Sequence, residues 1–115
     1  MDIKRFQKRF QEFIDERNWE QFHNPKNLSM ALAGEAGELL DVFQWLTPEE
    51  SEKQNIGPEL KQAAKEELAD VFIYLMRLAD KLDIDLESAD YEKMIKNRKK
   101  YPSDKFNGTL YKYNR

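Results

Sequence analysis

Apolar residues recur along most of the chain at the three- and four-residue spacing of amphipathic helices. The four helices that this pattern predicts cover about residues 2–17, 28–45, 59–82 and 86–100. Tyr101-Pro102 ends the last of them, and the tail, about residues 103–115, is predicted to be irregular. Four helices joined by short connections indicate an all-α fold, a four-helix bundle that forms a single domain over residues 1–115.

The connections carry residues that favour turns and helix ends. Asn27 is the expected cap of the second helix, and Pro25 is expected to interrupt the chain before it. Thr47-Pro48 ends the second helix and is typical of the start of a short helical turn, with proline at its first position.

The third predicted helix is apolar over an unusually wide surface. Leu68, Leu75 and Leu82 belong to a long stripe, and Ile73 and Met76 extend the apolar surface almost around the helix. A helix of this kind is usually buried on several sides. In a chain of 115 residues, this pattern predicts a partner subunit and therefore an oligomer, a dimer at least.

The amino-acid composition excludes several kinds of catalytic and binding site. The chain has no cysteine and one histidine, which excludes disulfides, thiol nucleophiles and sites built from several imidazoles. The 19 basic and 22 acidic residues give a formal net charge of −3 without a separate basic stripe, so nucleic-acid binding is not expected. We see no apolar run long enough for a membrane span and no signal peptide, and we therefore expect a cytoplasmic protein.

Two acid pairs lie where the helical pattern calls for apolar residues. Glu35 and Glu38 in the second helix, like Glu67 and Asp70 in the third, are three residues apart and so adjacent on one helix face. At about 100° per residue, Glu35 and Glu67 fall inside the apolar arcs, and Glu38 and Asp70 fall at their margins. Acids on an inward face are unfavourable unless they are paired or bind a metal ion.

Four carboxylates on two facing helices need a cation if they are to share one pocket. An all-oxygen ligand set fits a hard ion such as magnesium or manganese. The alternative is that these acids pair with lysine or arginine on a neighbouring helix. Gly34 and Gly37 flank Glu35 and indicate close approach of a ligand or of another helix, because glycine is unfavourable inside a helix.

A set of further motifs accompanies the two acid pairs in a fixed order. They are Arg17 to His23, Asn27-Leu28, Phe43-Gln44-Trp45, Ile73-Tyr74-Leu75, and Lys93-Met94 followed by Asn97 and Tyr101-Pro102. Together, over about residues 6–113, they resemble the MazG-type, all-α nucleotide pyrophosphohydrolases, and most of all the dCTP pyrophosphatase branch of that family. The acid motif alone is weak, whereas the ordered set is highly specific.

The resemblance implies an enzyme that hydrolyses a nucleoside triphosphate, dCTP or a modified dCTP, between the α and β phosphates. The products would be the monophosphate and pyrophosphate, and the role would be nucleotide-pool sanitation. It implies magnesium held by four catalytic acids, Glu35, Glu38, Glu67 and Asp70. Glu38, or a carboxylate acting through a water, is the candidate general base. It also implies a homodimer or homotetramer with pockets completed across subunits.

The candidate phosphate-binding residues lie at the end of the fourth predicted helix. By resemblance, Lys93, Asn97, Lys100 and Tyr101 contact phosphate or sugar, and Lys112 in the tail is a weaker candidate. The spacing of the first three places them on one helix face. The alternative is a solvated basic helix end that complements the helix dipole.

The candidate base-binding residues are aromatic. By resemblance, Trp19 and Trp45 stack on the base, and Phe22 and His23 beside Trp19 suit a flat ligand. The alternatives are that the tryptophans close a helix end and a loop, and that His23 is a hydrogen-bonded loop histidine. Tyr74, beside Glu67, either orients a ligand carboxylate or packs in the core.

One residue departs from the dCTP branch. Phe10 stands where that branch has a base-pocket histidine, so hydrogen-bonded readout of the base is lost there and apolar contact or stacking remains. Other deoxynucleotides and modified pyrimidines are therefore open as substrates. The competing hypothesis for function is a non-catalytic helical-bundle interaction module whose acids form surface salt bridges.

Overall fold

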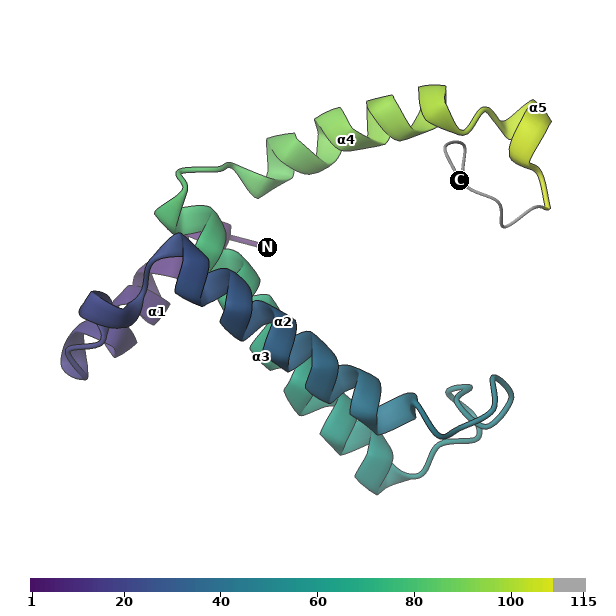
Figure 1. Ribbon diagram of the computed structural model, residues 1–115, viewed down its shortest axis with the longest axis horizontal. Coiled ribbons are helices and arrows are strands. Elements are labelled where there is room, and N and C mark those ends of the chain that lie inside the picture. The colour runs from purple at the N-terminus through teal and green to yellow at the C-terminus, as the bar shows by residue number, and fades with distance from the viewer. Residues whose placement is uncertain (109–115) are drawn as a thin grey trace. The chain divides into compact units, whose positions relative to one another are not determined.

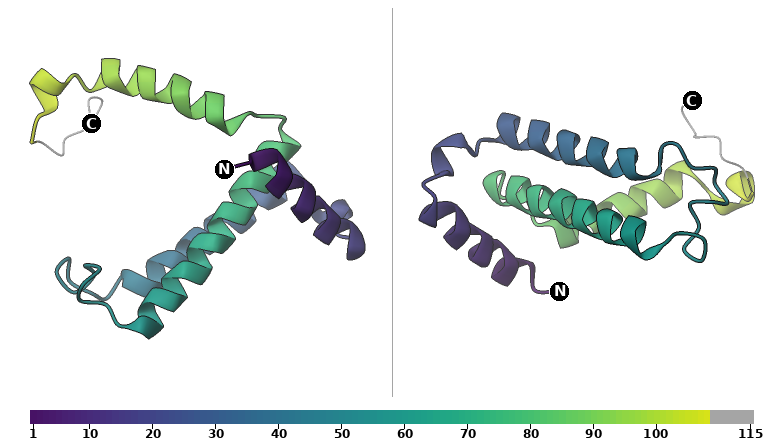
Figure 2. Two further views of the ribbon diagram at one scale, coloured as in Figure 1. Left: turned by 180° about the vertical axis from the view of Figure 1, so that it is seen from behind. Right: turned by 90° about the horizontal axis from the view of Figure 1, so that it is seen from below.

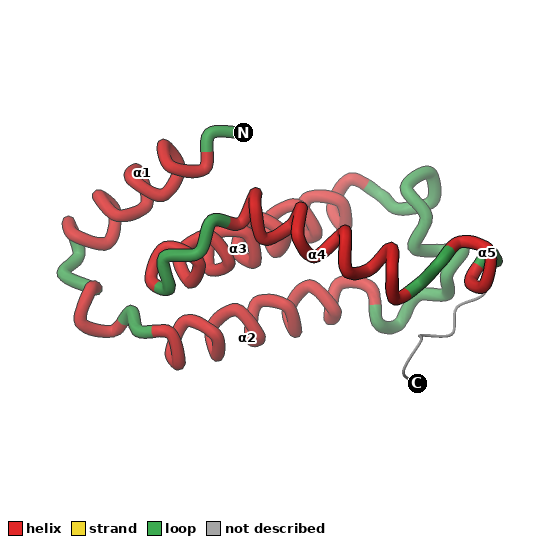
Figure 3. Tube along the Cα trace, turned by 90° about the horizontal axis from the view of Figure 1, so that it is seen from above, coloured by secondary structure: helices red, strands yellow, loops and turns green. Residues whose placement is uncertain are grey.

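The computed structural model describes residues 1–108, and all regular structure in that range is helical (Figure 1; Figure 3). The all-α prediction is confirmed. The described chain forms two compact units, Met1–Asp83 and a second that begins at Ile84. The first unit contains α1 (Ile3–Glu16), η1 (Glu20–Phe22), α2 (Pro25–Phe43) and α3 (Pro58–Lys81), and the second contains α4 (Leu86–Lys100) and α5 (Ser103–Phe106).

The helix ends follow the cap chemistry of the sequence, with one correction. The cap of α2 is Asn24, whose side chain accepts a hydrogen bond from the Asn27 backbone N–H at 2.9 Å, so the prediction that Asn27 is the cap was wrong. Pro25 opens α2 rather than interrupting the chain, because the first helical residue needs no N–H donor. The helix also ends at Phe43, before Trp45.

α2 and α3 form the framework of the first unit. They are consecutive, run antiparallel and lie side by side along most of their lengths (Figure 1; Figure 2). α1 packs against α3, where the Phe6 and Phe72 rings meet edge to face at 4.8 Å and Gln7 donates a hydrogen bond to the Met76 carbonyl at 3.2 Å. The buried apolar residues are Ile14, Leu28, Ala64, Met76 and Ala79.

The end of α1 is a Schellman motif that fixes the backbone of Trp19. Asn18 has φ 55°, in the left-handed region that asparagine tolerates better than most residues. The Trp19 N–H reaches the Ile14 carbonyl at 3.1 Å, and the Asn18 N–H reaches the Asp15 carbonyl at 3.1 Å. The Trp19 ring packs edge-on against Phe13 with centroids 5.8 Å apart, which is the apolar contact typical of this motif.

The second unit contains α4, whose predicted bounds are matched by the structure. Asp85 caps it by accepting hydrogen bonds from the Glu87 and Ser88 N–H groups at 3.0 and 3.3 Å. The tail is not irregular throughout, because Ser103–Phe106 forms α5, whose Phe106 ring packs edge-on against Tyr101 at 5.3 Å. Lys112 lies outside the described residues.

Several apolar side chains of the first unit remain exposed. Leu68, Leu75 and Leu82 lie seven residues apart along one side of α3 and its end, with exposed fractions of 55%, 38% and 47%. On α2, Met30 and Leu40 are 62% and 60% exposed. In the described part of the chain, no helix combines the length and apolar character needed to span a membrane. The four-helix bundle and the single domain stay predictions.

Candidate functional site

The acids singled out by helical spacing meet between α2 and α3. Glu35 and Glu38 on α2 and Glu67 on α3 each place a carboxylate oxygen within 4.8 Å of the others. Asp70, one turn beyond Glu67, is close enough for its charge to act on Glu35 and Glu67. Glu35 and Glu67, which the helical pattern places inside the apolar arcs, are half-buried. Of the two acids placed at the margins, Asp70 is half-buried and Glu38 is exposed.

Glu35, Glu38, Glu67 and Asp70 form an acid cluster whose carboxylates repel one another. Burial, followed by the closeness of Glu38 and the charge of Asp70, raises the pKa of Glu35 to about 7. Burial and the neighbouring Glu38 likewise raise the pKa of Glu67. The Oε2 atoms of Glu35 and Glu67 are both buried, and neither has a hydrogen-bond partner within the described chain.

The predicted alternative, pairing with lysine or arginine, is not seen in the first unit. Among residues 1–83, the ion pairs of the structure involve Glu16, Glu20 and Asp80, and none involves the acid cluster. Buried carboxylate oxygens without partners are uncommon in folded proteins and often mark a site for an ion or other ligand.

Gly34 and Gly37 leave open space beside the acid cluster. A Cβ atom built on either residue has no neighbour within 4 Å among the described residues. Within the first unit, no helix therefore packs closely against these glycines. Both explanations offered by the sequence stay predictions: a ligand, or a helix from outside the first unit.

The two tryptophans lie at opposite ends of α2. Trp19 precedes the helix and Trp45 follows it, and the 19 residues of α2 span about 28 Å. Trp19 is 42% exposed and Trp45 is 86% exposed, so both rings are accessible to a ligand. One copy of the first unit therefore does not bring the two rings together in a single base pocket.

Aromatic rings extend from Trp19 along α1. Phe10 stacks on Phe13 with centroids 5.8 Å apart and an interplanar angle of 8°, and Phe13 meets Trp19 edge to face. The phenylalanine that replaces the expected histidine thus belongs to an aromatic row that leads to Trp19. Phe22, in η1, is 58% exposed.

His23 is hydrogen-bonded to an arginine that the sequence reasoning missed. Its Nδ1 accepts a hydrogen bond from Nε of Arg77 at 3.2 Å, and burial together with the Arg77 charge lowers the pKa of His23. Arg77 is only 2% exposed. Its place among Met76 and Ala79 on the inward side of α3 was a readable signal, of the same kind that identified Glu35.

The other predicted site residues are placed as follows. Tyr74 lies on α3, two turns beyond Glu67, and is half-buried. Lys93, Asn97 and Lys100 share α4 in the second unit, followed by Tyr101, and the Lys100 ammonium lies 5.7 Å from the centre of the Tyr101 ring. Asn97, Lys100 and Tyr101 are half-buried and Lys93 is exposed.

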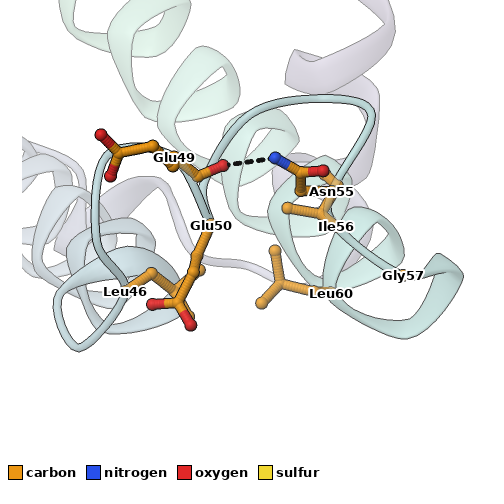
Figure 4. A pocket seen from close by; sticks show the side chains of 7 residues that line it. All are labelled: Leu46, Glu49, Glu50, Asn55, Ile56, Gly57 and Leu60. Atoms are coloured by element: carbon orange, nitrogen blue, oxygen red, sulfur yellow. Dashed lines mark hydrogen bonds between the residues drawn. The ribbon is translucent and has the colours of Figure 1, made fainter.

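A hollow of about 310 Å³ lies where the α2–α3 connection meets the start of α3 (Figure 4). Its lining consists of Leu46, Glu49, Glu50, Asn55, Ile56, Gly57 and Leu60. The Asn55 side chain donates to the Glu49 carbonyl at 2.7 Å, and Thr47 and Glu50 exchange reciprocal hydrogen bonds of 2.8 and 3.2 Å. These bonds serve the connection itself, and none of the predicted site residues lines the hollow.

Comparison with known proteins places the acid cluster in context. The chain is 47% identical over 102 residues to dCTP pyrophosphatase 1 of Bos taurus, and equally to that of Homo sapiens, with 89% of this chain aligned. The alignment spans 60% of the length of those relatives. A pyrophosphatase from Archaeoglobus fulgidus has a similar structure, with a TM-score of 0.80, 37% identity, and coverage of 89% of this chain and 94% of the other.

A family model matches most of the chain. The match runs over residues 31–115 and includes both acid pairs. It confirms the resemblance that the ordered motifs indicated, and the chain belongs to the MazG-like family.

Proposed function

We propose that this chain acts as a magnesium-dependent nucleoside triphosphate pyrophosphohydrolase with dCTP or a related deoxynucleotide as substrate. The observation that carries the proposal is the acid cluster, in which buried Oε2 atoms of Glu35 and Glu67 have no partner in the described chain. The 47% identity to dCTP pyrophosphatase 1 supplies the reaction and the substrate class.

The residues present fit a divalent metal ion. Three carboxylates converge within 4.8 Å, Asp70 adds negative charge beside them, and no basic group of residues 1–83 neutralises them. Glu35, Glu38, Glu67 and Asp70 would hold magnesium or manganese, hard ions that prefer carboxylate oxygens. When bound, the ion would screen the anionic triphosphate from the acids and promote attack by water at phosphorus.

The other steps of the proposed reaction are assigned to individual side chains. Without a cation, a pKa of about 7 leaves the Glu35 carboxyl protonated in roughly half of the molecules at neutral pH, and binding of an ion displaces that proton. Glu38, the exposed member of the acid cluster, is the candidate general base, directly or through a water. Lys93, Asn97, Lys100 and Tyr101 are the candidates for phosphate and sugar contacts.

The direct test is pyrophosphate release from a panel of canonical and 5-modified nucleotides, with magnesium and with EDTA. We expect magnesium-dependent release from deoxycytidine nucleotides and relaxed discrimination among pyrimidine bases, because Phe10 offers stacking but no hydrogen bond. Release from no nucleotide at any magnesium concentration would overturn the proposed function. The interaction-module hypothesis requires that result.

We further propose that the chain works as a homodimer or a homotetramer, with the four helices completing a bundle in the assembly. The exposed leucine stripe of α3 and the open space at Gly34 and Gly37 support this arrangement. The separation of Trp19 and Trp45 by the length of α2 supports it independently, since two copies can supply one tryptophan each to a pocket.

Mixed oligomers test this arrangement. Trp19→Ala and Trp45→Ala are each expected to raise KM about tenfold or more, because stacking on a base is lost. Co-expressed in equal amounts as dimers, the two variants should regain about a quarter of the wild-type sites, since half of the dimers are mixed and each has one intact pocket. A monomer by light scattering, or a mixture no more active than its parents, would contradict the shared pocket.

A further inference from the structure

Arg77 ties α1 and the η1 segment to α3 through one buried guanidinium group. Its Nε donates to His23 Nδ1 at 3.2 Å, Nη1 donates to Gln11 Oε1 at 2.5 Å, and Nη2 donates to Glu20 Oε2 at 2.5 Å. A buried positive charge is unfavourable unless it is paired and hydrogen-bonded. Here Glu20 supplies a negative charge, and so does Asp80, whose carboxylate lies 3.5 Å from Arg77 Nη1, so the buried guanidinium group is both paired and hydrogen-bonded.

Glu20 is the point where the segment after α1 is tied to α3. Besides Arg77, it pairs with Lys81 on the next turn of α3 and accepts a hydrogen bond from Gln11 at 3.0 Å. The Lys81, Gln11 and Arg77 contacts lower the pKa of Glu20 to about 2, so it remains a carboxylate at any physiological pH. The two oxygens of one side chain thus contact α1 and two successive turns of α3.

This network, Arg77 with Gln11, Glu20 and His23, holds the segment that directly follows Trp19. Trp19 directly precedes Glu20, and its backbone is already fixed on the other side by the Schellman motif at the end of α1. Arg77 also lies seven residues beyond Asp70 on the same face of α3, about 10 Å along the helix axis. One rigid helix therefore carries both half of the acid cluster and the anchor of the Trp19 segment.

We propose that Arg77 is a positioning residue for base recognition: by holding Glu20 and His23 against α3, it sets the position of the Trp19 ring relative to Glu67 and Asp70. This inference rests on the proposed function, in which Trp19 stacks on the base while the acids act on the triphosphate. Arg77 itself need not touch the substrate. A lysine cannot replace it, because one ammonium group lacks the planar fork that reaches three acceptors in different directions.

Two variants test the role, each with a matched control. Arg77→Lys keeps the charge and removes the fork, and Arg5→Lys is its control at an exposed arginine. Glu20→Ala removes the acceptor at a side chain that is 47% exposed and so is not expected to prevent folding, and Glu16→Ala, at 72% exposure, is its control.

The first readout is hydrogen exchange in the protein without nucleotide or metal. We expect the amides of residues 19–23 to exchange at least about tenfold faster in Arg77→Lys and Glu20→Ala than in the wild type, with α2 and the controls unchanged. Exchange in residues 19–23 that matches the wild type in both variants would overturn the proposal. This measurement decides the structural part of the proposal even if the wild type hydrolyses no nucleotide, which is the separate failure of the proposed function.

The second readout is steady-state kinetics with deoxycytidine triphosphate and magnesium. We expect KM to rise about five- to tenfold in Arg77→Lys and Glu20→Ala while kcat and the affinity for magnesium stay within about twofold, because base binding is weakened and the acid cluster is untouched. A parallel loss of kcat and magnesium affinity would show a general structural role and overturn the proposal, as would an unchanged KM.

Discussion

Glu67→Gln is expected to lower magnesium-dependent pyrophosphate release by about two to three orders of magnitude, the largest effect of any substitution proposed for this chain. Glu67 is the α3 carboxylate that meets Glu35 and Glu38 of α2 within 4.8 Å. Glutamine keeps the shape and removes the negative charge, so the packing between α2 and α3 is retained while the ligand set loses a charged oxygen. Isothermal titration with magnesium should show a parallel loss of ion binding.

The neighbouring acid provides the matched control for this substitution. Glu66 precedes Glu67 on α3 but is exposed, and its carboxylate accepts a hydrogen bond from Gln62 at 3.2 Å. Glu66→Gln makes the same chemical change one residue away and should leave activity and magnesium affinity within about twofold of the wild type, since surface substitutions seldom have large effects. Equal losses in the two variants, or full activity in Glu67→Gln, would refute the assignment of the acid cluster.

The acid cluster could be predicted from the sequence because a helix converts spacing into position. Glu35 and Glu67 fall inside apolar arcs at about 100° per residue, and the structure shows both half-buried and facing each other. The same argument applied to Arg77 would have identified it as a buried charge. What spacing alone does not give is its partners, because Gln11, Glu20 and His23 come from segments whose packing depends on the whole first unit.

The cap of α2 and the separation of the two tryptophans could not be predicted from residue patterns. Asn24 and Asn27 are both good cap residues, and the structure uses the earlier one because Pro25 fits the first helical position. The distance between Trp19 and Trp45 could not be predicted from the motifs either. The motifs give only the order of the two residues along the chain, whereas their separation in space depends on the length of α2.

The metal-free protein is expected to lose stability as the pH rises from about 5 to 8, because the pKa of Glu67 is raised in the fold and so is that of Glu35. The Glu35 pKa of about 7 lies above the ordinary value of 4.5, so between these values the folded chain binds more protons than the unfolded chain. Stability from this group is therefore complete below about pH 4.5 and is lost as the pH rises through 7. The lowered pKa of His23 acts in the opposite direction, since it favours stability as the pH rises through its ordinary value of 6.5.

Glu35→Gln isolates the Glu35 contribution, because glutamine resembles the protonated carboxyl at every pH and leaves His23 unchanged. In EDTA at pH 8, the variant should melt a few degrees above the wild type, and the difference should shrink towards pH 5. Magnesium should reverse the order, since it stabilises only a protein that binds it, and binding requires the ionised carboxylate. Thermal melts at pH 5, 6, 7 and 8, with EDTA and with magnesium, measure both effects. Parallel curves for the two proteins in EDTA would show that Glu35 carries no unfavourable charge, and the electrostatic argument for a cation at the acid cluster would fail with it.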